Sequence, residues 1–124
     1  MNKINVLILK NDDNGNLTFE EKMIDDELNV YYDIIDCNTI DIISRRFGNI
    51  DFDFVIDDEF LLKDHSTIPT LEYKESWKEA LFGTIIIAGR TEDGNKDGEL
   101  HGLTHKDVLF IKDYIATKGR IYSV

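Results

Sequence analysis

The fold of this chain depends most on one stretch, TIDIISRRFGNIDFDFVIDDE, which covers residues 39–59. Two β-rich segments flank Gly48 and Asn49, and glycine at the first central position of a two-residue loop is typical of a type II′ turn. The stretch therefore predicts a β-hairpin at 39–59. Its cross-strand pairs are expected to be Phe47 with Ile50, Arg46 with Asp51, Ser44 with Asp53, and Ile43 with Phe54.

The alternation of side chains predicts that the two faces of this hairpin differ, because successive residues of a strand point to opposite faces. The apolar residues all fall on one face, which is expected to pack on the core: Ile43, Phe47, Ile50, Phe52, Phe54 and Ile56. The opposite face is expected to be in water, and it holds Arg46, Asp51, Asp53 and Asp57.

The elements before the hairpin follow from shorter patterns. Residues 4–9 form an apolar run that predicts a first strand, and residues 17–23 are expected to return as its partner after the turn formers at 11–16. A helix is predicted over residues 26–35, with Asp25 or Asp26 as its N-cap and Leu28, Tyr31 and Ile35 on its apolar face.

Two further helices and two strands are predicted after the hairpin. Tyr73, Trp77 and Leu81 recur at helical spacing behind Pro69, which predicts a helix over residues 71–81. Residues 83–88 predict a buried strand. Residues 105–117 predict a last helix that Thr104 caps, with Asp107 at the reciprocal position of a capping box, and residues 120–124 an edge strand. Mixed strands and helices without a regular alternation predict a single α+β domain over 1–124, with a mainly antiparallel sheet.

The composition fits one globular domain. The 124 residues are 42% hydrophobic with a net charge of −11, enough apolar residues for a core despite the acidity. The single cysteine, Cys37, leaves no internal disulfide to form, and it is expected to be a half-buried structural thiol. No apolar run approaches a membrane span or a secretory leader, so no membrane association and a cytoplasmic location are expected.

The negative charge lies almost entirely in the first half of the chain. Residues 1–64 contain 16 acidic and 6 basic side chains, a net of −10, whereas residues 65–124 contain 9 and 8, a net of −1. Such a field repels nucleic acid, so no direct nucleic-acid binding is expected, and it attracts basic partners.

The candidate partner-binding residues are the acids of the hairpin and a second group just before or inside it. The first group is Asp51, Asp53, Asp57, Asp58 and Glu59, and the second is Asp33, Asp36 and Asp41. Three interpretations stay open: a solvated face that serves only solubility in a scaffold domain, a surface that binds a basic partner or mimics DNA, and a metal site. DNA mimicry would require carboxylates along a ridge at the spacing of phosphates.

An enzyme or metal-dependent binding protein is the rival hypothesis. It would use Asp57, Asp58 and Glu59 with a histidine. The loop at 93–104 matches the opening of an EF-hand at Asp93, Asn95 and Asp97, but its twelfth position is Thr104, where a bidentate glutamate is required, so these are weak metal candidates. No catalytic or cofactor-binding motif is found, so no catalytic residue and no cofactor are assigned, and the balance is against an enzyme.

Several of these segments, taken in order, are similar to a known family. They are CNTIDI at 37–42, IDDE at 56–59, LFGT at 81–84, and Leu103-Thr104 followed by Asp107. The chain resembles, over about residues 25–117, a family of small uncharacterised domains carried by phages, plasmids and other mobile elements of Gram-positive bacteria. The resemblance implies a role in host takeover or defence evasion and supplies no catalytic residues. We therefore expect a non-enzymatic interaction protein that engages a basic surface.

Overall fold

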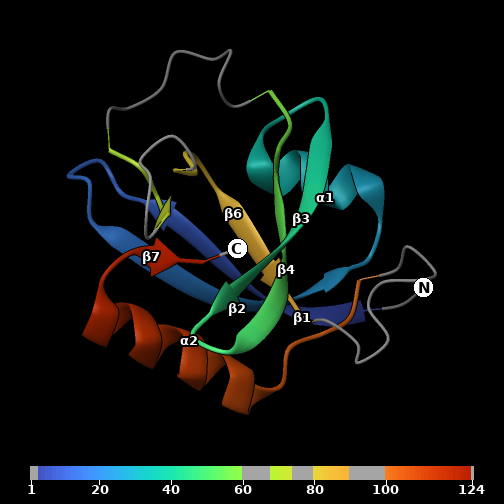
Figure 1. Cartoon of the computed structure of the whole chain (residues 1–124). Helices are drawn as coiled ribbons and strands as arrows, with labels where there is room; N and C mark the ends of the chain where they lie inside the picture. Colours follow the sequence, from blue (N-terminus) through green and yellow to red (C-terminus); the bar gives the residue numbers. More distant parts are fainter. Residues whose placement is uncertain (1–2, 60–67, 74–79, 90–99, 124) are drawn as a thin grey trace.

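The computed structural model describes residues 3–59, 68–73, 80–89 and 100–123. In these ranges the chain forms two helices and seven strands (Figure 1). Their order is β1 Lys3–Asn11, β2 Leu17–Asp25, α1 Leu28–Ile35, β3 Ile40–Phe47, β4 Ile50–Asp57, β5 Glu72–Tyr73, β6 Ile85–Ala88, α2 His105–Lys118 and β7 Ile121–Tyr122. The α+β prediction is confirmed, with two helices in place of about three.

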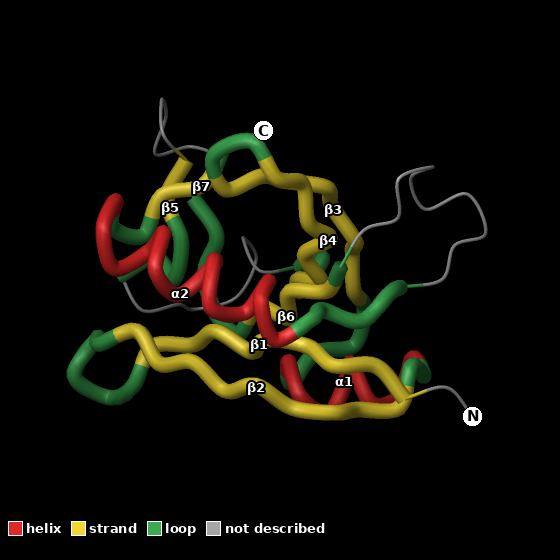
Figure 2. Tube along the Cα trace, turned by 90° about the horizontal axis from the view of Figure 1, so that it is seen from below, coloured by secondary structure: helices red, strands yellow, loops and turns green. Residues whose placement is uncertain are grey.

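A five-stranded antiparallel sheet of order β2-β1-β6-β4-β3 forms the centre of the fold. The two helices lie on opposite faces of this sheet (Figure 2). On one face, Val108, Ile111 and Ile115 of α2 pack with side chains such as Leu7 and Phe54. On the other face, Tyr31 and Ile35 of α1 pack with Val6, Ile8, Val55 and Ile86. Residues 6–9 of β1 and 85–88 of β6 are apolar on both faces because both faces are covered.

The predicted hairpin at 39–59 is confirmed residue by residue. Strands β3 and β4 pair antiparallel in the register Phe47 with Ile50, Arg46 with Asp51, Ser44 with Asp53 and Ile43 with Phe54. Gly48 has a φ of 63°, the positive value that the first central residue of this turn requires. A local turn signal was therefore enough to fix the register.

The prediction that one hairpin face is in water is wrong for β4. Asp53 and Asp57 are only 3% and 8% exposed, and the face that they share with Val55 is not in water, since Val55 packs in one cluster with Tyr31 and Ile35 of α1. Ile50, expected in the core, is 43% exposed beside the turn. Strand β4 lies between β6 and β3, so it is an interior strand, and the alternation of its sequence does not mark a solvated face.

The predicted helix at 26–35 is confirmed as α1, with differences at its start. Its N-cap is Glu27, not Asp25 or Asp26, and no side chain caps it. Tyr31 and Ile35 are buried as expected, whereas Leu28 is exposed. Asp26 accepts a hydrogen bond of 2.5 Å from the Tyr31 hydroxyl, which joins the first turn of α1 to the segment before it.

The predicted helix at 71–81 is wrong at both ends. Glu72 and Tyr73 form β5, which pairs in parallel with β7, and Leu71 pairs with Leu81. The middle of that prediction, residues 74–79 with Trp77, lies outside the described residues. Tyr73 does not pack along a helix but on the Tyr122 ring, at a centroid distance of 5.7 Å. Tertiary contacts therefore outweigh the local helical pattern in this segment.

The last helix and the C-terminal strand agree with their predictions. Thr104 accepts a hydrogen bond from the Asp107 backbone, and Asp107 accepts one in return from the Thr104 backbone, which completes the capping box. Gly119 ends α2. Residues 121–122 form β7, and Ser123 exchanges two backbone hydrogen bonds of 2.8 and 2.9 Å with Arg46 of β3.

Substitution of the α2 cap should lower stability by a measurable amount. Thr104→Ala removes one of two reciprocal cap bonds, and we expect a loss of about 1 kcal/mol in the free energy of unfolding, measured by urea denaturation. Thr117→Ala, an exposed threonine in the last turn of the same helix, is the matched control and should change stability by less than about 0.5 kcal/mol. Equal losses in both variants would contradict the capping argument.

The Tyr31 hydroxyl predicts a specific loss of stability in alkali. Burial, the hydrogen bond to Asp26 and the negative charge of Asp26 all raise the pKa of Tyr31. An unfolded tyrosine ionises near pH 10 whereas the folded one stays neutral, so this group's contribution is complete below about pH 10 and falls by about 1.4 kcal/mol per pH unit above it.

Paired denaturation curves of the wild type and Tyr31→Phe test this expectation. At pH 8 the wild type should be more stable by about 1 kcal/mol, because the variant lacks the hydrogen bond. At pH 11 the difference should vanish or reverse, since phenylalanine does not ionise. A difference that is constant between the two pH values would show that Tyr31 does not contribute in this way.

Candidate functional site

The strand order brings four separate segments to one end of the central sheet. Neighbouring strands are antiparallel, with Leu9 opposite Ile85, Val55 opposite Ile86, and Ile40 opposite Asp57. The end of β1, the start of β6, the end of β4 and the start of β3 therefore lie at the same end, in the upper part of Figure 1. This end is where most of the acidic candidates meet.

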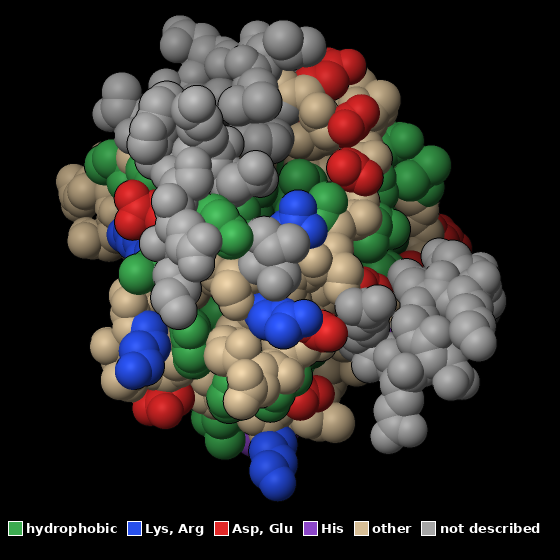
Figure 3. Space-filling model, viewed as in Figure 1, with side chains coloured by type: hydrophobic (Ala, Val, Ile, Leu, Met, Phe, Trp, Pro, Cys, Tyr) green, Lys and Arg blue, Asp and Glu red, His purple; other side chains and the backbone are tan. Residues whose placement is uncertain are grey.

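Five exposed carboxylates lie at this end on the side of β3, β4 and α1. We call them the acidic end, and they are Asp33, Asp36, Asp41, Asp58 and Glu59. Asp36 is the C-cap of α1, four residues before β3 begins, and the Asp58 backbone N–H donates to the Thr39 carbonyl oxygen at 3.1 Å. Figure 3 shows acidic side chains gathered beside α1 and the start of β3.

Three other sequence candidates do not belong to this surface. Asp51 lies at the opposite end of the hairpin, where its carboxylate is 3.2 Å from Arg46 Nε. Asp53 and Asp57 are buried in β4, and Asp57 Oδ1 accepts a hydrogen bond of 2.9 Å from the Glu59 backbone N–H. The alternation predicts a single exposed row of acids along the hairpin. In the structure this row is interrupted, because Asp53 and Asp57 are buried.

Two further carboxylates, which sequence reasoning did not select, lie at the same end of the sheet. Asp12 and Asp13 are exposed in the turn between β1 and β2. Strand β6 alone separates β1 from β4, so this turn and the end of β4 belong to the same end of the sheet. The turn formers at 11–16 indicated a turn, but only the strand order shows which other acids belong to the same end of the sheet.

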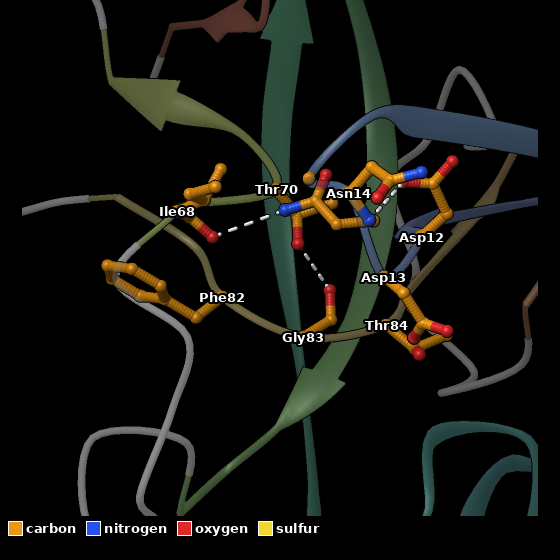
Figure 4. A pocket seen from close by; sticks show the side chains of 10 residues that line it. Asp12, Asp13, Asn14, Ile68, Thr70, Phe82, Gly83 and Thr84 are labelled. Atoms are coloured by element: carbon orange, nitrogen blue, oxygen red, sulfur yellow. Dashed lines mark hydrogen bonds between the residues drawn. The ribbon is translucent and has the colours of Figure 1, made fainter.

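A pocket of about 480 Å³ opens beside this turn. Residues 11–15, Ile68, Thr70 and residues 82–84 line it, and Figure 4 shows how their side chains lie. Asp12 Oδ1 accepts 2.9 Å hydrogen bonds from the backbone N–H groups of Asn14 and Asn16, which fixes the conformation of the turn. The Thr70 hydroxyl donates to the Gly83 carbonyl oxygen at 2.6 Å, which joins the two other segments of the lining.

Arg120 fixes one side of this pocket from outside its lining. Its guanidinium donates to the Asn11 side-chain oxygen at 2.8 Å, to the Pro69 carbonyl oxygen at 3.2 Å and to the Gly15 carbonyl oxygen at 2.6 Å. Asn11 in turn donates to the Ile68 carbonyl oxygen at 3.2 Å. Three segments far apart in the sequence are thus held together by polar bonds.

The metal hypotheses find no geometric support in the described residues. Within residues 3–59, 68–73, 80–89 and 100–123, no group of three His, Cys, Asp or Glu side chains could hold a metal ion. The EF-hand-like candidates Asp93, Asn95 and Asp97 lie outside the described residues. Asp57 is turned into its own loop, so the Asp57, Asp58 and Glu59 cluster does not converge on one point.

The described histidines lie away from the acidic end. His101 pairs with Gly89, directly after the far end of β6, and His105 Nδ1 is 3.3 Å from the Glu21 carboxylate in β2. The hydrogen bond from Asn5 and the neighbouring His105 lower the pKa of Glu21. Cys37 is half-buried against the α1 core, as expected for a structural thiol.

No helix among the described residues combines the length and apolar character that a membrane crossing needs. Comparison with curated proteins and with solved structures finds no match. One family does match, over residues 4–115, and it is described as a domain of unknown function, DUF3846. Since this match covers most of the chain, the protein belongs to the DUF3846 family.

Proposed function

We propose that this domain is a non-enzymatic interaction module whose acidic end binds a basic surface on a protein partner. The observation that carries the proposal is the gathering of Asp33, Asp36, Asp41, Asp58 and Glu59 at one end of the sheet. Exposed charges of one sign on a rigid scaffold raise the rate at which an oppositely charged surface associates and help to orient it.

The distribution of basic residues supports the same conclusion. Residues 23–44 contain six acidic side chains and residues 47–62 contain five, and neither segment has a lysine or an arginine. The two arginines between them, Arg45 and Arg46, belong to the turn half of the hairpin, away from the acidic end. The field at the acidic end is therefore not neutralised by the two segments that form it.

A basic protein surface fits the acidic end better than DNA mimicry does. A duplex presents about one negative charge per 1.7 Å of its axis, so a mimic needs a long row of carboxylates. Asp53 and Asp57 are buried and Asp51 lies at the other end of the hairpin, which leaves a compact group.

We further propose a biological setting for this interaction. The resemblance to domains of mobile elements from Gram-positive bacteria supports a role in host takeover or defence evasion, with the partner a basic host protein of the cytoplasm. A small acidic domain can bind such a protein and block its basic surface without catalysing a reaction.

The acidic end is tested by two triple variants with the same change of charge. Asp41→Asn/Asp58→Asn/Glu59→Gln neutralises part of it, and Glu20→Gln/Glu72→Gln/Asp113→Asn neutralises three exposed acids elsewhere. The probe is a fluorescent lysine-rich peptide, and binding is measured by anisotropy at 50 and 200 mM NaCl. Three exposed charge contacts of about 0.5 kcal/mol each give an expected loss of about tenfold for the first variant.

The second triple variant should change the affinity by less than about threefold, and added salt should weaken the wild type more than the first variant. Equal losses of affinity in the two variants would show that peptide binding depends only on the net charge of the domain. The acidic residues would then serve solubility. Binding that does not depend on salt would also contradict an electrostatic surface.

A further inference from the structure

We propose that the pocket beside the β1–β2 turn binds a small organic cation, an alkylammonium group whose carbon chain lies on Phe82 and Ile68 and whose ammonium contacts the Asp13 carboxylate. This inference goes beyond the proposed function, because attraction between the acidic end and a basic surface needs no cavity. Either proposal can fail while the other holds.

The size and rigidity of the pocket are those of a ligand site. Its volume of about 480 Å³ falls in the range of about 300–1,000 Å³ that is usual for pockets that bind small molecules. Arg120 holds the Asn11, Gly15 and Pro69 side of the wall through three hydrogen bonds. Thr70 holds the Gly83 side at 2.6 Å. A wall that is already fixed costs a ligand little ordering.

The charge of the lining selects a cation. Among the residues that the structure describes, the lining contains Asp12 and Asp13 and no lysine or arginine. The nearest guanidinium that the structure describes, that of Arg120, is directed at oxygen atoms of Asn11, Gly15 and Pro69. The Asp12 carboxylate accepts hydrogen bonds from backbone N–H groups of its own turn. Asp13 is exposed and, among the described residues, forms no hydrogen bond or ion pair. Its carboxylate is therefore available to a ligand.

The apolar and polar parts of the lining are separated along the pocket. Figure 4 shows Phe82 and Ile68 on one side, and Asp13 next to Thr84 on the other, with Gly83 between them. Ile68 is 41% exposed, and it packs so closely on Gly15 that a β-carbon there would lie 2.6 Å from Ile68 Cδ1. A ligand with an apolar chain and one cationic end matches this separation.

A free alkylamine and the side chain of a lysine share this chemistry, so the test includes both. Amide ¹H–¹⁵N spectra of the full chain are recorded at pH 7 while n-pentylamine, Nα-acetyl-lysine N-methylamide or neutral n-pentanol is added. We expect the amides of Asp13, Gly15, Gly83 and Thr84 to shift with either amine, with a dissociation constant on the order of 1 mM for so small a ligand. Tighter binding of pentylamine would point to a free amine, and tighter binding of the lysine derivative to a protein side chain.

Two variants and a matched control make the test specific. Asp13→Asn should weaken pentylamine binding at least fivefold, and Phe82→Leu should weaken it while the rest of the spectrum stays that of the folded protein. Asp113→Asn removes the same charge from an exposed site on α2 and should change the affinity by less than twofold.

Four results would overturn the proposal. They are equal binding of pentanol and pentylamine, equal weakening by Asp13→Asn and Asp113→Asn, no shift at about 20 mM amine, and displacement of the amine by CaCl₂ beyond the effect of NaCl at the same ionic strength. The last result would identify the occupant as a metal ion.

Discussion

Strand β4 lies between β6 and β3, with α2 packed on one face of the sheet and α1 on the other. This cover on both faces determines the rest of the structure. It explains why β1 and β6 are nearly uniform apolar runs, and why Phe52 and Phe54 on one side of β4 and Val55 on the other are all buried. It also decides which acids can meet a partner, because a carboxylate in the middle of β4 is removed from water whatever its position in the sequence pattern.

The parts of the fold that could be predicted from the sequence are those with local causes. The Gly48-Asn49 turn sets the hairpin register through the chemistry of two residues, and the α2 cap depends on Thr104 and Asp107, three positions apart. The segment at 71–81 failed for the opposite reason. Its helical spacing is real, but Leu71 pairs with Leu81 at the other end of the same segment, and Tyr73 packs on Tyr122 of β7. Neither contact follows from the local pattern of apolar residues.

The candidate site shows the same division between local and distant causes. Asp41, Asp58 and Glu59 could be selected from the sequence because they flank one hairpin, and Asp36 follows from the helix that precedes it. Asp12 and Asp13 could not be connected with them, since their place at the same end of the sheet depends on β6, more than 70 residues later, inserting between β1 and β4. Alternation placed Asp53 and Asp57 on the correct face of β4, but it could not show that this face is buried.

The bonds of Arg120 have a consequence for the order in which the domain assembles. The guanidinium and the Asn11 side chain that it contacts are 109 residues apart, so the contact closes a loop of nearly the whole chain. Contacts of such long sequence separation require a large loss of chain entropy before they form, and they are expected late in folding. During synthesis the first hairpin and the β3–β4 hairpin emerge from the ribosome well before Arg120 does, so the side of the pocket that Arg120 fixes takes its final form only after residue 120 has been made.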